Sequence, residues 1–227
     1  MTTSGSVIFL GFDVSMFSYI TELVGTVAFS ISGAMIAIER DLDLFGVLFL
    51  GIVTAIGGGV VRDLLLGLNP PMAFVNYVYL ALAAVTALVL FIIAWVRYRK
   101  GKPIKFINDD LLNVLDAAGL GIFSVIGAQN TINAGFGDNA FFCIFLGMTT
   151  GVGGGMLRDI MSQSTPMVLR KYIYALASLA GAICFYYLQP LSETASIIIS
   201  VALVIVLRVL ASHYRWTLPR VIPLQKK

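Results

Sequence analysis

The sequence predicts an all-α polytopic membrane protein, because it is too apolar for a soluble domain and its basic residues gather in alternate loops. Of the 227 residues, 59% are hydrophobic and 12% are charged, and the mean hydropathy is +0.93. Soluble domains are about half apolar and about a quarter charged. Composition therefore excludes a disordered chain, a secreted disulfide scaffold and a nucleic-acid-binding module. We treat residues 1–227 as a single membrane domain with no nucleic-acid partner.

Seven segments are apolar enough to cross a bilayer, for which a helix needs ~20 apolar residues. The predicted transmembrane helices lie at about 17–38, 44–66, 72–96, 111–131, 140–161, 169–188 and 193–212. The third is uncharged and long enough to tilt. The second and fifth are the least regular, because each contains a Gly triplet and an Arg-Asp pair. The short connections favour antiparallel packing of neighbouring helices.

The basic residues predict the orientation of the chain. Twelve of the 15 lysines and arginines would face the cytoplasm if the N-terminus lies outside, and the outer loops would carry none. Cytoplasmic loops are enriched in Lys and Arg. We therefore expect a multi-pass inner-membrane protein with its N-terminus outside and its tail, 213–227, in the cytoplasm. The basic run at 97–105 mainly sets this topology, and binding of anionic lipid headgroups is its second interpretation.

The chain contains an internal repeat. FLGIVTAIGGGVVRD at 49–63 matches FLGMTTGVGGGMLRD at 145–159, and FSISGA at 29–34 matches FSVIGA at 123–128. Residues 17–96 thus correspond to 111–190, and the helix at 193–212 stands alone. Each copy holds an odd number of helices, so the second copy must enter the membrane from the opposite side. The sequence therefore predicts two inverted three-helix repeats related by an axis in the membrane plane.

The repeated Gly triplets lie near the middle of the second and fifth helices. Consecutive glycines favour a kink or a break, and broken backbone at membrane depth must be buried in protein or line a polar path. Close helix packing is the alternative interpretation. The predicted kinks and nearby hydroxyl groups of a polar pathway are Gly57, Gly58, Gly59, Gly153, Gly154, Gly155, Thr54, Thr149, Thr150, Ser30 and Ser124. Each hydroxyl, taken alone, could instead bond to its own helix.

Charged residues inside the predicted helices are further candidates, because charge is costly at membrane depth. They are Glu22, Arg62, Asp63, Asp116, Arg158, Asp159 and Arg208. Mirrored depths pair Glu22 with Arg62 near one face and Asp116 with Arg158 near the other. Asp63 and Asp159 would then face the pathway. The pairs could also serve only to hold the repeats together.

The doubled motif GGG-x-x-RD, placed in the second and fifth of seven helices, resembles the bacterial and archaeal relatives of the trimeric intracellular cation channels. That group is also labelled a glycine-transporter domain family. The resemblance covers about 17–212. It implies a homotrimer with one pore inside each protomer, lined by glycine-kinked helices two and five. It also implies potassium as the main permeant ion, with sodium passing as well, and no cofactor.

Two functions of different class remain at this point. The first is a passive monovalent-cation channel, and the second is a secondary transporter of a small solute such as an amino acid. Inverted repeats with broken helices fit transporters as well as channels. An enzyme is not expected, because no nucleophile–base pair or metal-ligand spacing is visible in the sequence.

Overall fold

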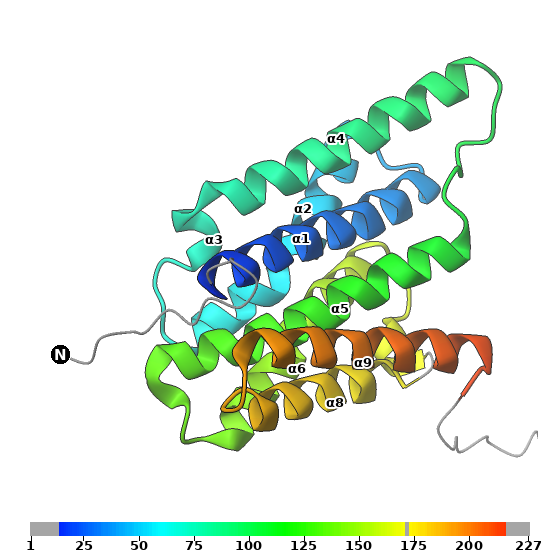
Figure 1. Cartoon of the computed structure of the whole chain (residues 1–227). Coiled ribbons are helices and arrows are strands. Elements are labelled where there is room, and N and C mark those ends of the chain that lie inside the picture. The colour runs from blue at the N-terminus through cyan, green and yellow to red at the C-terminus, as the bar shows by residue number, and fades with distance from the viewer. Residues whose placement is uncertain (1–13, 171–172, 217–227) are drawn as a thin grey trace, which may run out of the picture.

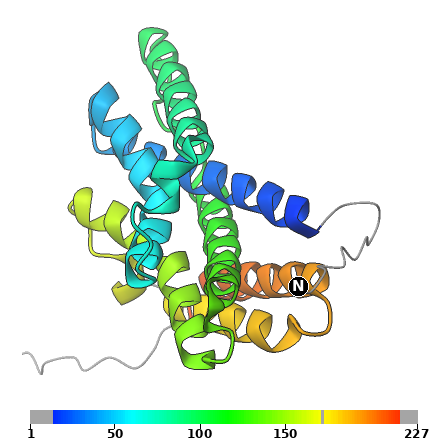
Figure 2. The ribbon, with the colours of Figure 1, turned by 90° about the vertical axis from the view of Figure 1, so that its left-hand side faces the viewer.

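The computed structural model describes residues 14–170 and 173–216, and over these residues it is all helical. The long helices are α1 (Val14–Glu39), α2 (Leu44–Leu65), α4 (Tyr77–Arg99), α5 (Asp109–Thr131), α6 (Ala140–Met161) and α9 (Glu193–His213). The shorter ones are α3 (Met72–Val75), the π-turn η1 (Ile132–Phe136), α7 (Met167–Arg170) and α8 (Tyr174–Leu188). In Figures 1 and 2, α4 lies at one edge of the bundle, while α8 and α9 lie at the opposite edge.

Side-chain caps fix where several of these helices begin. Asp43 accepts a hydrogen bond from Gly46 N at the start of α2, and Asn139 accepts one from Phe142 N at the start of α6. A capping side chain satisfies one of the free amides of the first turn. The caps explain why the predicted boundaries at 44 and 140 are accurate.

The third predicted span is interrupted, which the uncharged run at 72–96 does not indicate. Asn76 lies in an extended conformation between α3 and α4, and its side chain accepts a hydrogen bond from Val78 N. The residue therefore caps α4 and ends α3. The expected single helix is wrong at this point, because a local Asn cap competes with continuation of the helix.

Within the described residues, six helices are long and apolar enough to cross a membrane, rather than the seven predicted. They are α1, α2, α4, α5 with η1, α6 and α9. The predicted span at 169–188 is represented by α7 and by α8, whose 15 residues extend about 22 Å. This is shorter than the ~30 Å hydrocarbon core, and residues 171–172 lie outside the described residues.

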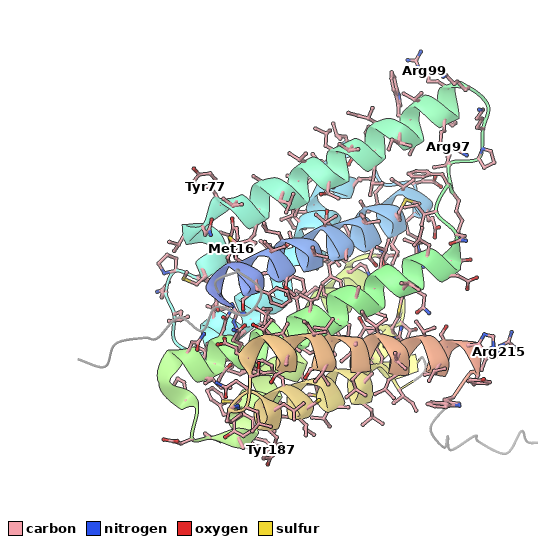
Figure 3. All side chains as sticks on the ribbon, viewed as in Figure 1. Met16, Tyr77, Arg97, Arg99, Tyr187 and Arg215 are labelled. Atoms are coloured by element: carbon pink, nitrogen blue, oxygen red, sulfur yellow. The ribbon has the colours of Figure 1, made fainter. Side chains whose placement is uncertain are left out.

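Basic residues lie together at one end of the bundle. Arg97, Arg99 and Arg215 lie at one end of the bundle, whereas Met16, Tyr77 and Tyr187 lie at the other (Figure 3). The clustering agrees with the charge pattern that underlies the predicted orientation. The expected positions of the N-terminus and of Lys171, Arg220, Lys226 and Lys227 fall outside the described residues.

Candidate functional site

The two Gly triplets meet where α2 and α6 pack against each other, and they allow the backbones to touch. A Cβ atom on Gly58 would lie 2.1 Å from the backbone O of Thr150, and one on Gly154 would lie 2.1 Å from the backbone O of Thr54. Both contacts are shorter than any real Cβ contact, so no larger residue fits. The contact is reciprocal, because the two glycines and the two threonines are equivalent positions of the repeat.

The Gly triplets do not break the helices, and the kinks that the sequence predicts there stay a prediction. α2 and α6 each continue as one α-helix through Gly57–Gly59 and Gly153–Gly155. The backbone hydrogen bonds are retained because the glycines supply close packing, as in other small-residue contacts between membrane helices. The triplets therefore do not free carbonyl groups for an ion.

The hydroxyl groups that the sequence predicts along a polar pathway form hydrogen bonds within the protein. Thr54, Thr149, Thr150 and Ser124 each donate to the carbonyl four residues earlier, at 2.6–2.7 Å. Ser30 bonds to Ala83 O at 2.7 Å, and its counterpart Ser124 also contacts Ser178 Oγ at 2.6 Å. The three threonines thus bond within their own helices, whereas Ser30 and Ser124 also connect neighbouring helices. That these hydroxyls line a path stays a prediction.

A cavity of about 40 Å³ lies beside the C-terminal half of α2, and we call it the α2-end cavity. Its lining includes Glu22, Thr26, Gly59, Arg62, Asp63, Met72 and Tyr79. Arg62 binds its neighbour Asp63 through Nε and Nη2, at 2.9 and 2.7 Å. Glu22 instead accepts a hydrogen bond from Tyr79 Oη at 2.8 Å. The predicted Glu22–Arg62 ion pair is therefore absent, although both side chains line one cavity.

At the equivalent place in the second repeat, the arginine and its acidic partner are buried. Arg158 Nη1 bonds Asp116 Oδ1 at 2.6 Å, which is the predicted pair, and also Ser32 Oγ at 2.6 Å. Its Nε bonds Asp159 at 2.9 Å. The Arg158 side chain is completely buried. We call these residues, together with Tyr174, the Arg158 cluster.

Tyr174 connects the Arg158 cluster to α9. The guanidinium of Arg208 lies 4.6 Å from the centre of the Tyr174 ring. Arg208 also donates to Asn113 Oδ1 at 3.0 Å. The buried Arg208 therefore packs against the cluster from α9, a contact that the sequence analysis did not predict.

Asp63 and Asp159 hold the chain that follows α2 and α6. The Oδ2 atom of Asp63 accepts from Met72 N at 2.8 Å, and that of Asp159 accepts from Met167 N at 2.7 Å. The same interaction thus positions the short helices α3 and α7. Each carboxylate also lines a cavity, Asp63 the α2-end cavity and Asp159 a second one. That these carboxylates face an ion pathway stays a prediction.

That second cavity, which we call the α6-end cavity, measures about 210 Å³. Ile36, Glu39, Arg40, Asp159, Ser164, Thr165 and Met167 line it. It lies near the C-terminal end of α1, whereas the α2-end cavity lies near the N-terminal end. Two acid-containing cavities are thus separated along the length of α1.

One face of α1 connects the two cavities, and the sequence analysis missed it. Glu22 and Thr26 line the first cavity, Ser32 contacts Arg158, and Ile36 lines the second. Residues three or four apart share one face of a helix. Phe29 lies between them on this face, with its ring centre 5.3 Å from that of Phe123. The spacing of three or four positions between these residues in the sequence could have indicated this face.

Comparison with known proteins assigns the family. A family model described as "Glycine transporter" matches residues 19–95 and again 113–190. The chain is also similar to a TRIC cation channel whose structure addresses conductance, with 36% identity and a TM-score of 0.77 over 90% of this chain and 97% of that one. The chain belongs to the TRIC family.

Other members support this assignment. The TRIC trimeric intracellular cation channel orthologue from Rhodobacter sphaeroides is 27% identical, with a TM-score of 0.79 over 88% of this chain and 100% of that chain. Among sequences, the UPF0126 inner membrane protein YadS of Escherichia coli is 38% identical and covers 89% of this chain and 94% of its own length. A UPF0126 membrane protein of Deinococcus radiodurans is 39% identical over 74% of this chain and 75% of its own length. This TRIC-family chain is therefore a multi-pass membrane protein whose structural neighbours are cation channels.

Proposed function

We propose that this TRIC-family protein is a monovalent-cation channel that prefers potassium and also passes sodium. The pore lies inside each protomer and follows the face of α1 that joins the α2-end and α6-end cavities. The observation that carries the proposal is that these two cavities lie at opposite ends of one helix face, with the Arg158 cluster between them. On this proposal the cluster, in which Arg158 is completely buried, closes the path.

Charge supports a cation as the permeant ion. Glu22 and Asp63 contribute carboxylates to the α2-end cavity, and Glu39 and Asp159 contribute them to the α6-end cavity. Arg62 and Arg40 offset part of this charge, but Arg62 is already bonded to Asp63. Fixed carboxylates in a region of low dielectric act strongly on a nearby cation. The carboxylates take over the role that the sequence analysis gave to carbonyls freed at the glycines.

The wider architecture is part of the same proposal. The family model matches the chain twice, and the Gly58–Thr150 and Gly154–Thr54 contacts are reciprocal, which supports two inverted repeats. Orientation with the N-terminus outside is supported by the grouping of Arg97, Arg99 and Arg215 at one end (Figure 3). A homotrimer is supported by the trimeric relatives and by the exposed apolar face of α4, where Val85, Val89 and Ile92 are 57%, 49% and 49% exposed.

Anionic lipid headgroups are the proposed partners of the loop at 97–105. A groove of about 220 Å³ beside this loop is lined mainly by apolar and aromatic side chains, among them Phe91, Trp95 and Tyr98, together with Asp41. Asp109 and Glu39 both bond Lys105 and raise its pKa above its usual value. Retention of phosphatidylglycerol by the purified protein, and its loss when Lys100 and Lys102 are replaced by Gln, would support this site.

A secondary transporter of a small solute is the second candidate, and the observation that favours it is the description of the matching family model. Measurements on the purified protein distinguish the two functions. In a planar bilayer with asymmetric KCl, a channel gives discrete current steps and a reversal potential close to that of potassium. Silence in the bilayer, together with saturable uptake of glycine into liposomes, would instead support the transporter.

Acidic residues at the cavities allow a more specific test. Asp63→Asn combined with Asp159→Asn is expected to reduce the preference for cations over chloride. Neutralising Lys100 and Lys102 serves as the control, because their charge lies in water and is screened over ~8 Å at physiological salt. An unchanged reversal potential in the Asp variant would contradict the electrostatic part of the proposal.

A further inference from the structure

The two repeats contain the same three polar positions and one glycine, in two different arrangements. Glu22, Gly59, Arg62 and Tyr79 of the first repeat correspond to Asp116, Gly155, Arg158 and Tyr174 of the second. In the first repeat the acid binds the tyrosine, with Tyr79 Oη donating to Glu22 at 2.8 Å. In the second repeat the acid binds the arginine, with Arg158 donating to Asp116 at 2.6 Å.

The second arrangement leaves hydrogen-bonding groups unused. Tyr174 Oη, Asp116 Oδ2 and Arg158 Nη2 are buried and have no hydrogen-bond partner. Asp116 nevertheless lies next to the Tyr174 hydroxyl, close enough for the two side chains to interact. Buried polar groups are almost always paired, and leaving them unpaired costs free energy. A donor and an acceptor that fit each other thus lie close together in the second repeat without completing a well-formed hydrogen bond.

The position of the tyrosine hydroxyl differs as well. Tyr174 Oη lies against the second Gly triplet, only 2.9 Å from where a Cβ atom on Gly155 would be. No atom of Tyr79 lies among the nearest neighbours of a Cβ on the equivalent Gly59, whose nearest atom is Arg62 Nη2 at 3.8 Å. The first tyrosine is therefore away from its triplet, on the wall of the α2-end cavity.

The backbone conformation of the residue just before each tyrosine also differs between the two repeats. Val78 lies inside α4, whereas its counterpart Ile173 precedes α8 and has a φ of +42°. Positive φ is strained for a β-branched residue such as Ile. The arrangement in the second repeat thus combines unpaired polar groups with a strained backbone next to Tyr174.

We infer that Tyr174 is a positioning residue for channel opening, and that the first repeat displays the arrangement that the second adopts when the path opens. On opening, Asp116 leaves Arg158 and accepts a hydrogen bond from Tyr174, as Glu22 accepts one from Tyr79. The tyrosine hydroxyl then moves off Gly155, and Arg158 keeps its bond to Asp159. No proton is transferred in this exchange. The inference rests on the proposed channel function, whose pathway passes the Arg158 cluster.

Tyr174→Phe tests the inference, because it removes only the hydroxyl. The ring and its contact with Arg208 remain, since Phe also supports a cation–π interaction. The hydroxyl makes no hydrogen bond in the closed structure, so the thermal midpoint of the purified protein is expected to stay the same or rise. Open probability in a planar bilayer is expected to fall about fivefold, the effect of one net hydrogen bond. Single-channel conductance and reversal potential are expected to be unchanged.

A second variant acts in the opposite direction. Asp116→Asn weakens the bond to Arg158 by removing its charge but keeps an oxygen that can accept from Tyr174. Open probability should rise in this variant, and adding Tyr174→Phe should cancel the increase. Tyr77→Phe, at an exposed position of α4, is the matched control and should behave as the wild type.

The outcomes separate the inference from the proposed function. A wild-type protein without cation current contradicts the channel itself. If the wild type conducts and Tyr174→Phe leaves its open probability unchanged, the inference is overturned and the channel stands. The same conclusion follows if Asp116→Asn has the same open probability with Tyr174 as with Tyr174→Phe. If Tyr174→Phe lowers the thermal midpoint together with open probability, its hydroxyl is a structural element of the closed state, and this outcome also overturns the inference.

Discussion

Arg62 and Arg158 occupy the same position in the repeat, but their surroundings differ. Arg62 bonds to Asp63 beside a cavity. Arg158 is completely enclosed and bonds to Asp116, Asp159 and Ser32. The Arg62–Asp63 pair is buried as well, with side chains 5% and 2% exposed. Removing either arginine therefore leaves an uncompensated carboxylate, which costs ~3–5 kcal/mol. The second repeat should be the more sensitive, because Arg158 bonds two carboxylates and a serine, whereas Arg62 bonds Asp63.

A pair of double-mutant cycles measures this difference. Asp116→Asn with Arg158→Met should show a coupling free energy of ~1–3 kcal/mol, because the residues are in direct contact. Glu22→Gln with Arg62→Met should be additive within about 0.5 kcal/mol, because no bond joins that pair. Unfolding of the purified protein in detergent provides the stabilities. Equal coupling in the two cycles would contradict the asymmetry between the repeats.

The residue pairs show how far sequence reasoning reaches at this scale. Mirrored depth predicted the Asp116–Arg158 pair correctly. It failed for Glu22 and Arg62, because a long guanidinium side chain can fold back onto the next residue of its own helix, as Arg62 does with Asp63. Helix-face rules describe where Cβ atoms point, and they do not limit the far end of an arginine. The partner of Glu22, Tyr79, lies 57 residues away, and only the fold brings it close.

At the scale of the helix, the Gly triplets act through space rather than through backbone conformation. α2 and α6 remain helical across them, and the crossing is close enough that Gly58 and Gly154 admit no side chain. The sequence identified the important positions but not their role. Both a broken helix and a close crossing require consecutive small residues, so only the position of the neighbouring helix decides between them.

The triplet itself supplies a controlled test of this role. Gly58→Ala and Gly154→Ala should each destabilise the protein by ~1–3 kcal/mol or more, since overpacking a tight contact carries this cost. Gly59→Ala should be tolerated, because its Cβ would meet only Arg62 Nη2, at 3.8 Å. Thermal midpoints in detergent compare the three variants. Similar midpoints for Gly58→Ala and Gly59→Ala would show that the crossing is looser than described here.

At the scale of the whole molecule, hydropathy and repeat analysis predicted most of the architecture. The all-helical fold and five of the long helices appear near the expected boundaries. The exceptions are local. Asn76 interrupts the third predicted span by capping α4, and the sixth is reduced to α7 and a 15-residue α8. Such interruptions depend on single polar side chains and on the path of the following turn, to which an average over an apolar window is insensitive.

The orientation of the molecule can be tested directly. Single cysteines at Tyr77 and Tyr187 should react with a membrane-impermeant reagent in intact cells, whereas cysteines at Arg99 and Arg215 should react only after the membrane is opened. The background replaces Cys143 and Cys184, the two native free cysteines. All four positions are exposed and lie at the two ends of the bundle (Figure 3). The reverse pattern would place the basic end outside and refute the predicted topology.

The central claim is that cations pass between the α2-end and α6-end cavities, and side-specific block of the current tests it most directly. Met72 and Thr165 are exposed residues that line the two cavities. In the same cysteine-free background, a positively charged thiol reagent should reduce the potassium current of Met72→Cys only from the outside and that of Thr165→Cys only from the cytoplasmic side. Tyr77→Cys, at the exposed start of α4 and outside both cavities, should be unaffected. Full current after complete modification of both cavity positions would contradict the pathway.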